Sequence, residues 1–164
     1  MAGIPAVTKA PFTFLRPGSL VDGDLDLVLM RMIPADPVKR YVPAYEFEMR
    51  RPGKAAGMGM IRLRIGSAPT LRYAGHIGYE VKSRFRGHRY AARSCRLLLP
   101  LAREHGLKAV WLTVDPKNFA SQKTCEILGA QWIETVRIPK THEMYSLGAR
   151  HRRRYKVELT PCNK

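Results

Sequence analysis

The stretch from Gly75 to Gly106 constrains the fold of this chain more than any other part of it. It begins with His76 to Val81, in which apolar and polar side chains alternate as in a half-buried β-strand. A basic loop follows, Arg86 to Ala92, and the segment from Tyr90 to His105 has the apolar spacing of a helix that packs on a sheet. Strand, loop and helix in this order predict an α/β unit.

The loop between this strand and helix is suited to bind an anion. The first amide groups of a helix have no carbonyl partner four residues earlier, and the helix dipole places partial positive charge at the same end. The small residues Gly87, Ala91 and Ala92 allow a ligand to approach these amides closely. The sequence therefore predicts a phosphate site where the helix begins.

A second block of the chain has its own strand and helix. Val110 to Val114 alternates like a strand, and the residues that follow lead into a short helix that stops at Gly129. Asn118 is a suitable N-cap for this helix, and glycine is favoured just beyond a helix C-terminus. Each of these two residues, taken alone, has a sufficient structural explanation.

Together the two blocks resemble the GNAT superfamily of N-acetyltransferases, whose acetyl-CoA loop reads Gln/Arg-x-x-Gly-x-Gly/Ala. Arg86 takes the first place of this loop and Ala91 the last. Arg89 stands where the family has its central glycine, and we expect it to keep a negative φ with its side chain turned outward to a CoA phosphate. The second block matches the family's Asn-x-x-Ser at 118–121, and Leu-Gly-Phe at 128–130 with alanine as the last residue.

The resemblance implies an α/β (α+β) fold: a mixed, mostly antiparallel twisted sheet of about seven strands with a central splayed parallel pair and flanking helices. Alternation in the sequence predicts strands at 24–33, 44–50, 60–65, 76–81, 110–114, 132–138 and 151–159. The second and third of these predict an antiparallel hairpin. Pro100 lies within the predicted helix and should kink or break it.

The resemblance also implies acetyl-CoA as co-substrate, a primary amine as acceptor and no metal. The acceptor is then a small molecule, a protein N-terminus or a lysine. By the same resemblance, backbone groups of Tyr79, Glu80 and Val81 bind pantetheine, Asn118 contacts the pantetheine arm and Ser121 the CoA moiety. The pyrophosphate would lie against Arg86, Gly87, His88, Arg89, Tyr90, Ala91 and Ala92.

Acetyl transfer to an amine also needs a base and an acid. Glu80 and His76 share one face of their strand, and either is a candidate for the base. Each has an ordinary alternative, Glu80 as a solvated ion-pair partner and His76 as a hydrogen-bonded strand residue. Family members often use a tyrosine about ten to fifteen residues beyond Leu-Gly-Phe as the acid, and Tyr145, in a predicted loop at 139–149, is the best match. Tyr155 is expected to pack in the core.

The formal net charge of +16 is the strongest compositional signal. It is compatible with nucleic acid, an acidic substrate or a polyphosphate cofactor as a partner. In the basic run at 151–159, Tyr155, Val157 and Leu159 alternate with charged residues, which favours a half-buried strand with a solvated outer face. We therefore expect only weak, non-specific nucleic-acid binding. The rival hypothesis is a non-catalytic module of the same fold that binds acyl-CoA or nucleic acid through its basic surface.

The length of 164 residues and the 45% hydrophobic content suit a single domain, 1–164, with residues 1–22 as an N-terminal arm. No stretch approaches the ~20 apolar residues of a membrane span, and the first residues lack the pattern of a signal peptide. We therefore expect a cytoplasmic protein without a membrane partner. Cys95, Cys125 and Cys162 lack metal-ligand spacing and are expected to be reduced thiols. The oligomeric state stays open, with a homodimer as one alternative.

Overall fold

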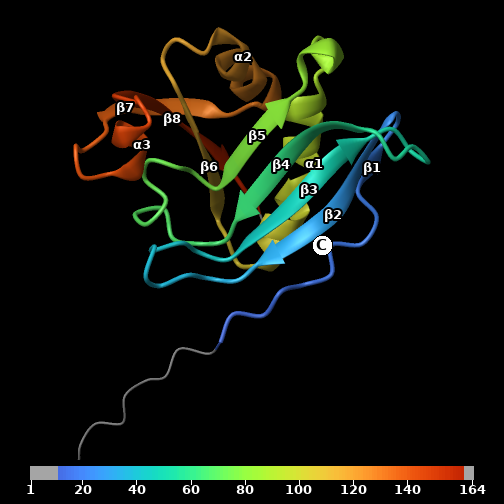
Figure 1. The fold of residues 1–164 in the computed structure, drawn as a ribbon, viewed down its shortest axis with the longest axis horizontal. Coiled ribbons are helices and arrows are strands. Elements are labelled where there is room, and N and C mark those ends of the chain that lie inside the picture. Colours follow the sequence, from blue (N-terminus) through green and yellow to red (C-terminus); the bar gives the residue numbers. More distant parts are fainter. Residues whose placement is uncertain (1–10, 161–164) are drawn as a thin grey trace, which may run out of the picture.

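The computed structural model describes residues 11–160, which form two antiparallel sheets with helices packed against them (Figure 1). The first sheet has the order β1-β2-β3-β4-β5 and the second the order β6-β8-β7. The strands of the first sheet are β1 (Val21–Asp22), β2 (Leu25–Ile33), β3 (Ala44–Arg50), β4 (Gly57–Arg64) and β5 (Ile77–Val81). Those of the second are β6 (Ala109–Val114), β7 (Gln131–Arg137) and β8 (His151–Glu158).

Four helical segments connect these strands. They are the 3-10 turn η1 (Ser83–Phe85) and the helices α1 (Tyr90–Glu104), α2 (Phe119–Leu128) and α3 (Glu143–Ser146). Figure 1 shows α1 behind the five-stranded sheet and α3 beside the strands β7 and β8. The segment at 139–149, predicted as a loop, thus contains one short helix. Among residues 11–160, no helix is both long and apolar enough to cross a bilayer.

The predicted hairpin is confirmed in β3 and β4. Phe47 pairs with Ile61 and Tyr45 with Leu63 in an antiparallel register, and all four side chains are buried. The residues between them point away from the core and are half-buried. The alternation in the sequence therefore corresponds to one buried face and one partly exposed face of the hairpin. This hairpin holds β5, the edge strand of the first sheet, in place.

The helix α1 covers the inner face of this sheet with the predicted stripe. The residues of the stripe, Ala91, Cys95, Leu98, Leu101 and Ala102, are all buried. The break expected at Pro100 is absent, because the helix continues to Glu104 with Pro100 on its exposed side. Leu98 and Leu101 anchor the helix on both sides of the proline, so packing compensates for the lost backbone hydrogen bond.

One hydrophobic core contains side chains from both sheets and from α1 and α2. Val110 and Leu112 of β6, and Tyr155 and Val157 of β8, belong to the same cluster as Phe47. The core residue Tyr155 packs as the sequence predicted. Cys95 and Cys125 are free, buried thiols, and burial raises the pKa of both. Cys162 lies outside the described residues.

The outer face of β8 differs from the prediction of a solvated charged face. Arg154 is only 6% exposed. Its guanidinium lies 4.2 Å from the Trp111 ring centroid, its Nε donates to the Arg72 carbonyl at 3.1 Å, and its Nη1 pairs with Glu134. Neighbouring residues of β6 and β7 cover the centre of this face, an arrangement that alternation within one strand cannot reveal.

The two sheets are joined at His76, just before β5. Its backbone amide donates to the Trp111 carbonyl at 2.7 Å, and the Trp111 amide donates to His76 Nδ1 at 2.9 Å. The other ring nitrogen, Nε2, therefore carries the proton and donates to the Gly66 carbonyl at 2.9 Å. Gly75 supports this joint, since a Cβ at its φ of +72° would lie 2.8 Å from the Trp111 carbonyl oxygen.

The role of His76 as a base is thereby corrected. The side chain is 1% exposed and both ring nitrogens are engaged, so it cannot take a proton from a substrate. Burial lowers the pKa of His76, which keeps the ring neutral. Beyond this joint β5 and β6 form no hydrogen-bonded ladder within the described chain, and this is the predicted splayed pair.

Candidate active site

A cleft of about 990 Å³ opens where β5 and β6 separate. Gly78 and Tyr79 of β5, Val114 at the end of β6, and Asn118 and Ser121 at the start of α2 line one part of it. The lining residues 77–79 of β5 and 112–114 of β6 both follow the contact between His76 and Trp111 along the chain, so β5 and β6 run in the same direction, as expected for strands joined by a crossover helix. The cleft therefore lies at the splayed ends of a parallel pair.

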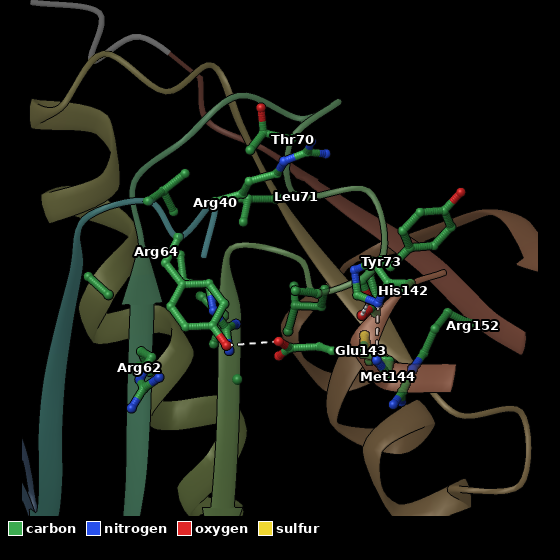
Figure 2. Close-up of a pocket in the computed structure, with 18 of the residues that line it drawn as sticks. Arg40, Arg62, Arg64, Thr70, Leu71, Tyr73, His142, Glu143, Met144 and Arg152 are labelled. Carbon is green, nitrogen blue, oxygen red and sulfur yellow. Dashed lines mark hydrogen bonds between the residues drawn. The ribbon is translucent and has the colours of Figure 1, made fainter. Parts of the chain in front are cut away.

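The other walls of the cleft come from segments far apart in sequence (Figure 2). They are the β2–β3 loop, the side chains of Arg62 and Arg64 on β4, Arg152 on β8, and residues 141–144 before and within α3. The Tyr41 hydroxyl of the β2–β3 loop donates to Glu143 Oε2 at 2.8 Å, which is the dashed bond from Glu143 in Figure 2. This bond ties two walls of the cleft together.

The backbone of β5 has one edge directed toward the cleft. The Lys82 amide donates to the Met58 carbonyl of β4 at 2.9 Å, and bonds in an antiparallel ladder alternate along the strand. Glu80 stands two residues before Lys82, so its backbone groups are also directed toward β4. Its carbonyl oxygen lies only 2.4 Å from the position that a Cβ on Gly59 would take. Backbone groups of Tyr79 and Val81 therefore point to the open edge, whereas the predicted pantetheine contact through the Glu80 backbone is wrong.

The Tyr79 side chain brings a buried hydroxyl to this site. Among residues 11–160 the hydroxyl makes no hydrogen bond of good geometry, but Ser121 and Thr124 are close enough to act on its pKa as hydrogen-bond partners. Burial raises the pKa of Tyr79 to about 12, so the phenol stays protonated at neutral pH. An unsatisfied buried hydroxyl is unusual, and a small rotation toward Ser121 or Thr124, or a bound group, would satisfy it.

The predicted phosphate site lies at the start of α1. No side chain caps this end, and the first helical hydrogen bond runs from the Arg93 amide to the Arg89 carbonyl at 2.9 Å, so the amides at 90–92 have no helical acceptor. Arg89 has a φ of +59°, which corrects the expected negative value. The backbone here keeps the left-handed conformation that suits the family glycine, at a cost of roughly 1–2 kcal/mol for a residue with a side chain.

Three side-chain contacts hold this loop against the β1–β2 turn. The Tyr90 hydroxyl donates to Asp24 Oδ2 at 2.5 Å, and Arg93 donates to Asp22 and Asp24 at 2.8 Å each. The hydrogen bond from Tyr90, and then those from Arg93, lower the pKa of Asp24. Tyr90 can thus offer its backbone amide to a ligand, while its side chain positions the loop.

The start of α2 agrees with the sequence prediction. Asn118 Oδ1 accepts a hydrogen bond from the Ser121 amide at 3.1 Å, and Gly129 ends the helix with a φ of +81°. Both Asn118 and Ser121 also line the cleft. Asn118 therefore has the structural role first considered, and both Asn118 and Ser121 have a place at the cleft.

Two predicted catalytic residues lie away from the cleft walls. Tyr145 is not among the lining residues, and the Arg150 guanidinium covers its ring at 3.7 Å from the centroid. The Glu80 side chain is exposed in a shallower hollow of about 300 Å³, which adjoins the cleft through Arg62, Arg64 and Gly78. Glu80 is thus near the site and Tyr145 is not part of its surface.

Sequence reasoning missed Tyr41 and Glu143 as site residues. Glu143 falls within the predicted loop at 139–149, and Tyr41 lies 102 residues from it in sequence. No local pattern links the two positions. The signal that could have pointed to Glu143 is its place among the polar residues after β7, in a segment that resembles a functional loop.

Comparison with known proteins agrees with this architecture. The sequence profile of the acetyltransferase (GNAT) domain matches residues 14–131. The chain belongs to this family. The match covers both blocks of the GNAT resemblance, from the strand at β5 to the end of α2. No curated protein sequence matches the chain significantly.

Solved acetyltransferase structures have the same fold. The microcin C7 self-immunity acetyltransferase in complex with acetyl-CoA and AMP aligns with a TM-score of 0.55 at 17% identity, over 70% of this chain and 61% of that chain. The ribosomal-protein-S5-alanine acetyltransferase from Vibrio fischeri aligns with a TM-score of 0.58 at 18% identity, over 74% of this chain and 64% of that chain. A GNAT-family acetyltransferase from Bacillus anthracis aligns with a TM-score of 0.55 at 17% identity, over 70% of this chain and 66% of that chain. This chain spans less than two thirds of the length of each of the three.

Proposed function

We propose that this protein is an acetyl-CoA-dependent N-acetyltransferase that acts on a primary amine. The observation that carries the proposal is the cleft at the splayed ends of β5 and β6, which has an open backbone edge on one side and Tyr79, with its buried hydroxyl, among its lining residues. At the end of β5 the chain turns into η1 and the uncapped start of α1. One extended ligand with a thioester at one end and phosphates at the other fits these features.

Acetyl-CoA would use the chain's own unpaired groups. The open edge at Tyr79 and Val81 offers backbone donors and acceptors to the amides of pantetheine, in the manner of an added strand. The amides at 90–92 and the exposed Arg89 offer donors to the pyrophosphate. Asn118 and Ser121 flank the pantetheine arm from α2.

The acceptor amine would lie at Glu143. This carboxylate can bind the ammonium group and accept one proton, after which the amine nitrogen attacks the thioester carbonyl carbon. The carbon–sulfur bond then breaks, and the Tyr79 hydroxyl donates a proton to the departing thiolate. The nitrogen of the new amide loses its second proton, which returns to the Tyr79 oxygen directly or through water, and Glu143 releases its proton to solvent. The neighbouring His142 is a poorer base, because its Nδ1 accepts from the Met144 amide at 3.1 Å and Nε2 must then carry the proton of the neutral ring.

Two named relatives indicate the range of acceptors. One is called a ribosomal-protein-alanine acetyltransferase and the other a microcin self-immunity acetyltransferase. These names connect the fold with a ribosomal protein in one case and with microcin self-immunity in the other. The rival hypothesis, a non-catalytic binding module, would need neither Glu143 in the cleft nor a protonated Tyr79 within it.

Acetyl-CoA binding is the first test of the proposal. A ligand that binds only the folded state adds about 2.7 kcal/mol of stability at a hundred times its Kd. We expect millimolar acetyl-CoA to raise the melting temperature, and thiol release to follow when amines are added. A melting temperature that does not respond to acetyl-CoA would contradict the proposed function.

The base is tested with two carboxylate variants of equal chemistry. Glu143→Gln should lower kcat/KM for amine acetylation by ~10²-fold or more at neutral pH, as general base catalysis typically contributes that much. Glu80→Gln, in the adjoining hollow, should have a much smaller effect. Both variants should still be stabilised by acetyl-CoA. The reverse order of the two effects would assign the base to Glu80, as the sequence first suggested.

A further inference from the structure

The walls of the cleft carry an excess of positive charge. The lining includes five cationic side chains and two carboxylates. The cationic residues are Lys39, Arg40, Arg62, Arg64 and Arg152, and the carboxylates are Asp115 and Glu143. A protonated amine alone would be repelled by such a cleft, so the excess charge requires an explanation beyond the amine itself.

Arg64 is the clearest case of an unpaired guanidinium in this cleft. It is half-buried, and within residues 11–160 it forms no ion pair within 4.0 Å. Its Nη1 donates to the Gly75 carbonyl at a long 3.4 Å. The guanidinium lies over Gly78 of β5, where a Cβ would be 3.3 Å from Nη1. The absence of a side chain at position 78 thus leaves room for Arg64 on the central strand.

The neighbouring Arg62 shows what a satisfied arginine looks like here. It pairs with Glu46, which also pairs with Arg31 at 2.7 Å, so Glu46 is fully engaged. The hydrogen bond from Arg62 is the largest cause of the lowered pKa of Glu46. Glu46 therefore cannot also serve Arg64, which stands next but one along β4.

Arg152 is a second half-buried arginine without a counter-ion. Its Nε atom is buried and has no hydrogen-bond partner in the described part of the chain. It approaches the cleft from β8, and in Figure 2 it lies on the other side of Glu143 from Arg62 and Arg64. Burial lowers the pKa of Arg64 and of Arg152, and the opposing attraction of Glu143 on Arg64 and of Asp115 on Arg152 is the smaller effect.

Removing a charge from water without pairing it is costly, and a ligand anion would remove that cost. We propose that the acceptor is a small amine that also carries a carboxylate or a phosphate, with its anion bound by Arg64, Arg152 adding attraction, and its ammonium at Glu143. This inference rests on the proposed acetyl transfer at the same cleft. A small molecule fits better than a folded protein, because the Tyr41–Glu143 hydrogen bond ties the walls together.

The first experiment compares three acceptors with the same two-carbon amine. They are ethanolamine, which is uncharged at its other end, β-alanine with a carboxylate, and phosphoethanolamine with a phosphate. We expect kcat/KM, measured by thiol release, to be at least about tenfold higher for one or both anionic amines, the scale of one charge-assisted pair. The better of the two identifies the anion.

The matched variants are Arg64→Gln and Arg137→Gln. Arg137 is exposed on β7 and does not line the cleft, so its loss changes the net charge equally. Arg64→Gln should reduce the preference for anionic over neutral amine to near one, and Arg137→Gln should keep it. Equal preference in all three proteins, a preference for ethanolamine, or a stronger preference for an acidic peptide N-terminus than for any small amine would overturn the inference.

A binding measurement covers the case in which none of the three amines is acetylated. Inorganic phosphate and acetate are titrated into protein saturated with acetyl-CoA, at constant ionic strength. Wild type should bind one of these anions at least about tenfold more tightly than Arg64→Gln does. Equal affinity overturns the anion site. A failure of the proposed function is a separate result, since it appears as an absence of acetyl-CoA binding.

Discussion

At the scale of single residues, the site depends on side chains whose polar groups are left over after folding. Among residues 11–160, the buried Tyr79 hydroxyl makes no hydrogen bond of good geometry, and the half-buried Arg64 guanidinium forms no ion pair with a carboxylate. Each such group destabilises the ligand-free protein, because buried polar groups lose water without full compensation. A ligand that binds to these groups would remove this cost. By contrast, the Tyr145 ring is already covered by Arg150.

A substitution at Tyr79 should separate stability from activity. Tyr79→Phe removes an unsatisfied buried hydroxyl, so the ligand-free protein should be as stable as wild type or more stable, by up to ~1–3 kcal/mol. The same change should lower kcat by ~10²-fold, because the proton donor to the thiolate is lost. Urea unfolding and thiol release measure the two effects.

The matched control for this prediction is Tyr145→Phe. Tyr145 does not line the cleft, so turnover and stability should both stay close to wild type. A large loss of kcat in Tyr145→Phe, with full activity in Tyr79→Phe, would restore the acid that the family resemblance suggested and contradict the assignment to Tyr79.

At the scale of elements, the site exists because two sheets meet at one point and then diverge. The His76 ring bridges the Trp111 amide and the Gly66 carbonyl, and so ties β6 and the loop after β4 to the start of β5. Past this joint the edge of β5 faces no partner strand among residues 11–160. The cleft therefore depends on a histidine that takes no part in the chemistry.

This joint should make stability depend on pH. Burial lowers the folded pKa of His76 below its unfolded value of about 6.5, so the unfolded state binds more protons near that pH. The stabilisation by His76 is complete above about pH 6.5 and is lost as the pH falls toward the folded pKa. Urea unfolding of wild type and His76→Gln should differ by ~1–3 kcal/mol at pH 8, and by less at pH 5.

The comparison between the two proteins isolates His76 from other groups. His105 is also partly buried, with a lowered pKa, but it titrates in both proteins and cancels in the difference. Stability curves of wild type and His76→Gln that run parallel from pH 8 to pH 5 would show that the joint does not titrate.

At the scale of the whole molecule, the charge of +16 is divided between internal contacts, the cleft and the surface. Some arginines form ion pairs within the fold: Arg93 pairs with Asp22 and Asp24, and Arg154 pairs with Glu134. Acidic residues number 13 against 29 lysines and arginines, so most of the positive charge has no acidic counterpart. This remainder produces a field that attracts anions in general.

Nucleic-acid binding should therefore be weak, unspecific and strongly salt-dependent. Counterion release makes the affinity of a protein for phosphate backbones fall steeply with salt. We expect the Kd for a short DNA duplex, measured by fluorescence anisotropy, to rise by at least about tenfold between 50 and 200 mM salt, with no difference between unrelated sequences. Tight, sequence-selective binding at 200 mM salt would instead favour the non-catalytic module.

What the sequence determined by itself is the local structure and the family. Alternation predicted the β3–β4 hairpin, the apolar stripe predicted α1, and Asn118 and Gly129 predicted the ends of α2. These features succeeded because residues close together in sequence decide them: the period of a strand or helix and the hydrogen bonds at a helix end. The two glycine- and asparagine-bearing blocks carried the family resemblance that the domain match confirms, and the second block supplies Asn118 and Ser121 to the cleft.

Tertiary structure alone decided which polar side chains meet. His76 lies 35 residues from Trp111 and Tyr41 lies 102 from Glu143, so neither pair leaves a periodic trace in the sequence. The sign of φ at Arg89 likewise followed from the loop geometry that ties Tyr90 and Arg93 to the β1–β2 turn, against the local preference of arginine. Burial and pairing depend on what the whole chain brings to a position, and for that reason the base and the acid that we propose, Glu143 and Tyr79, were found only from the folded arrangement.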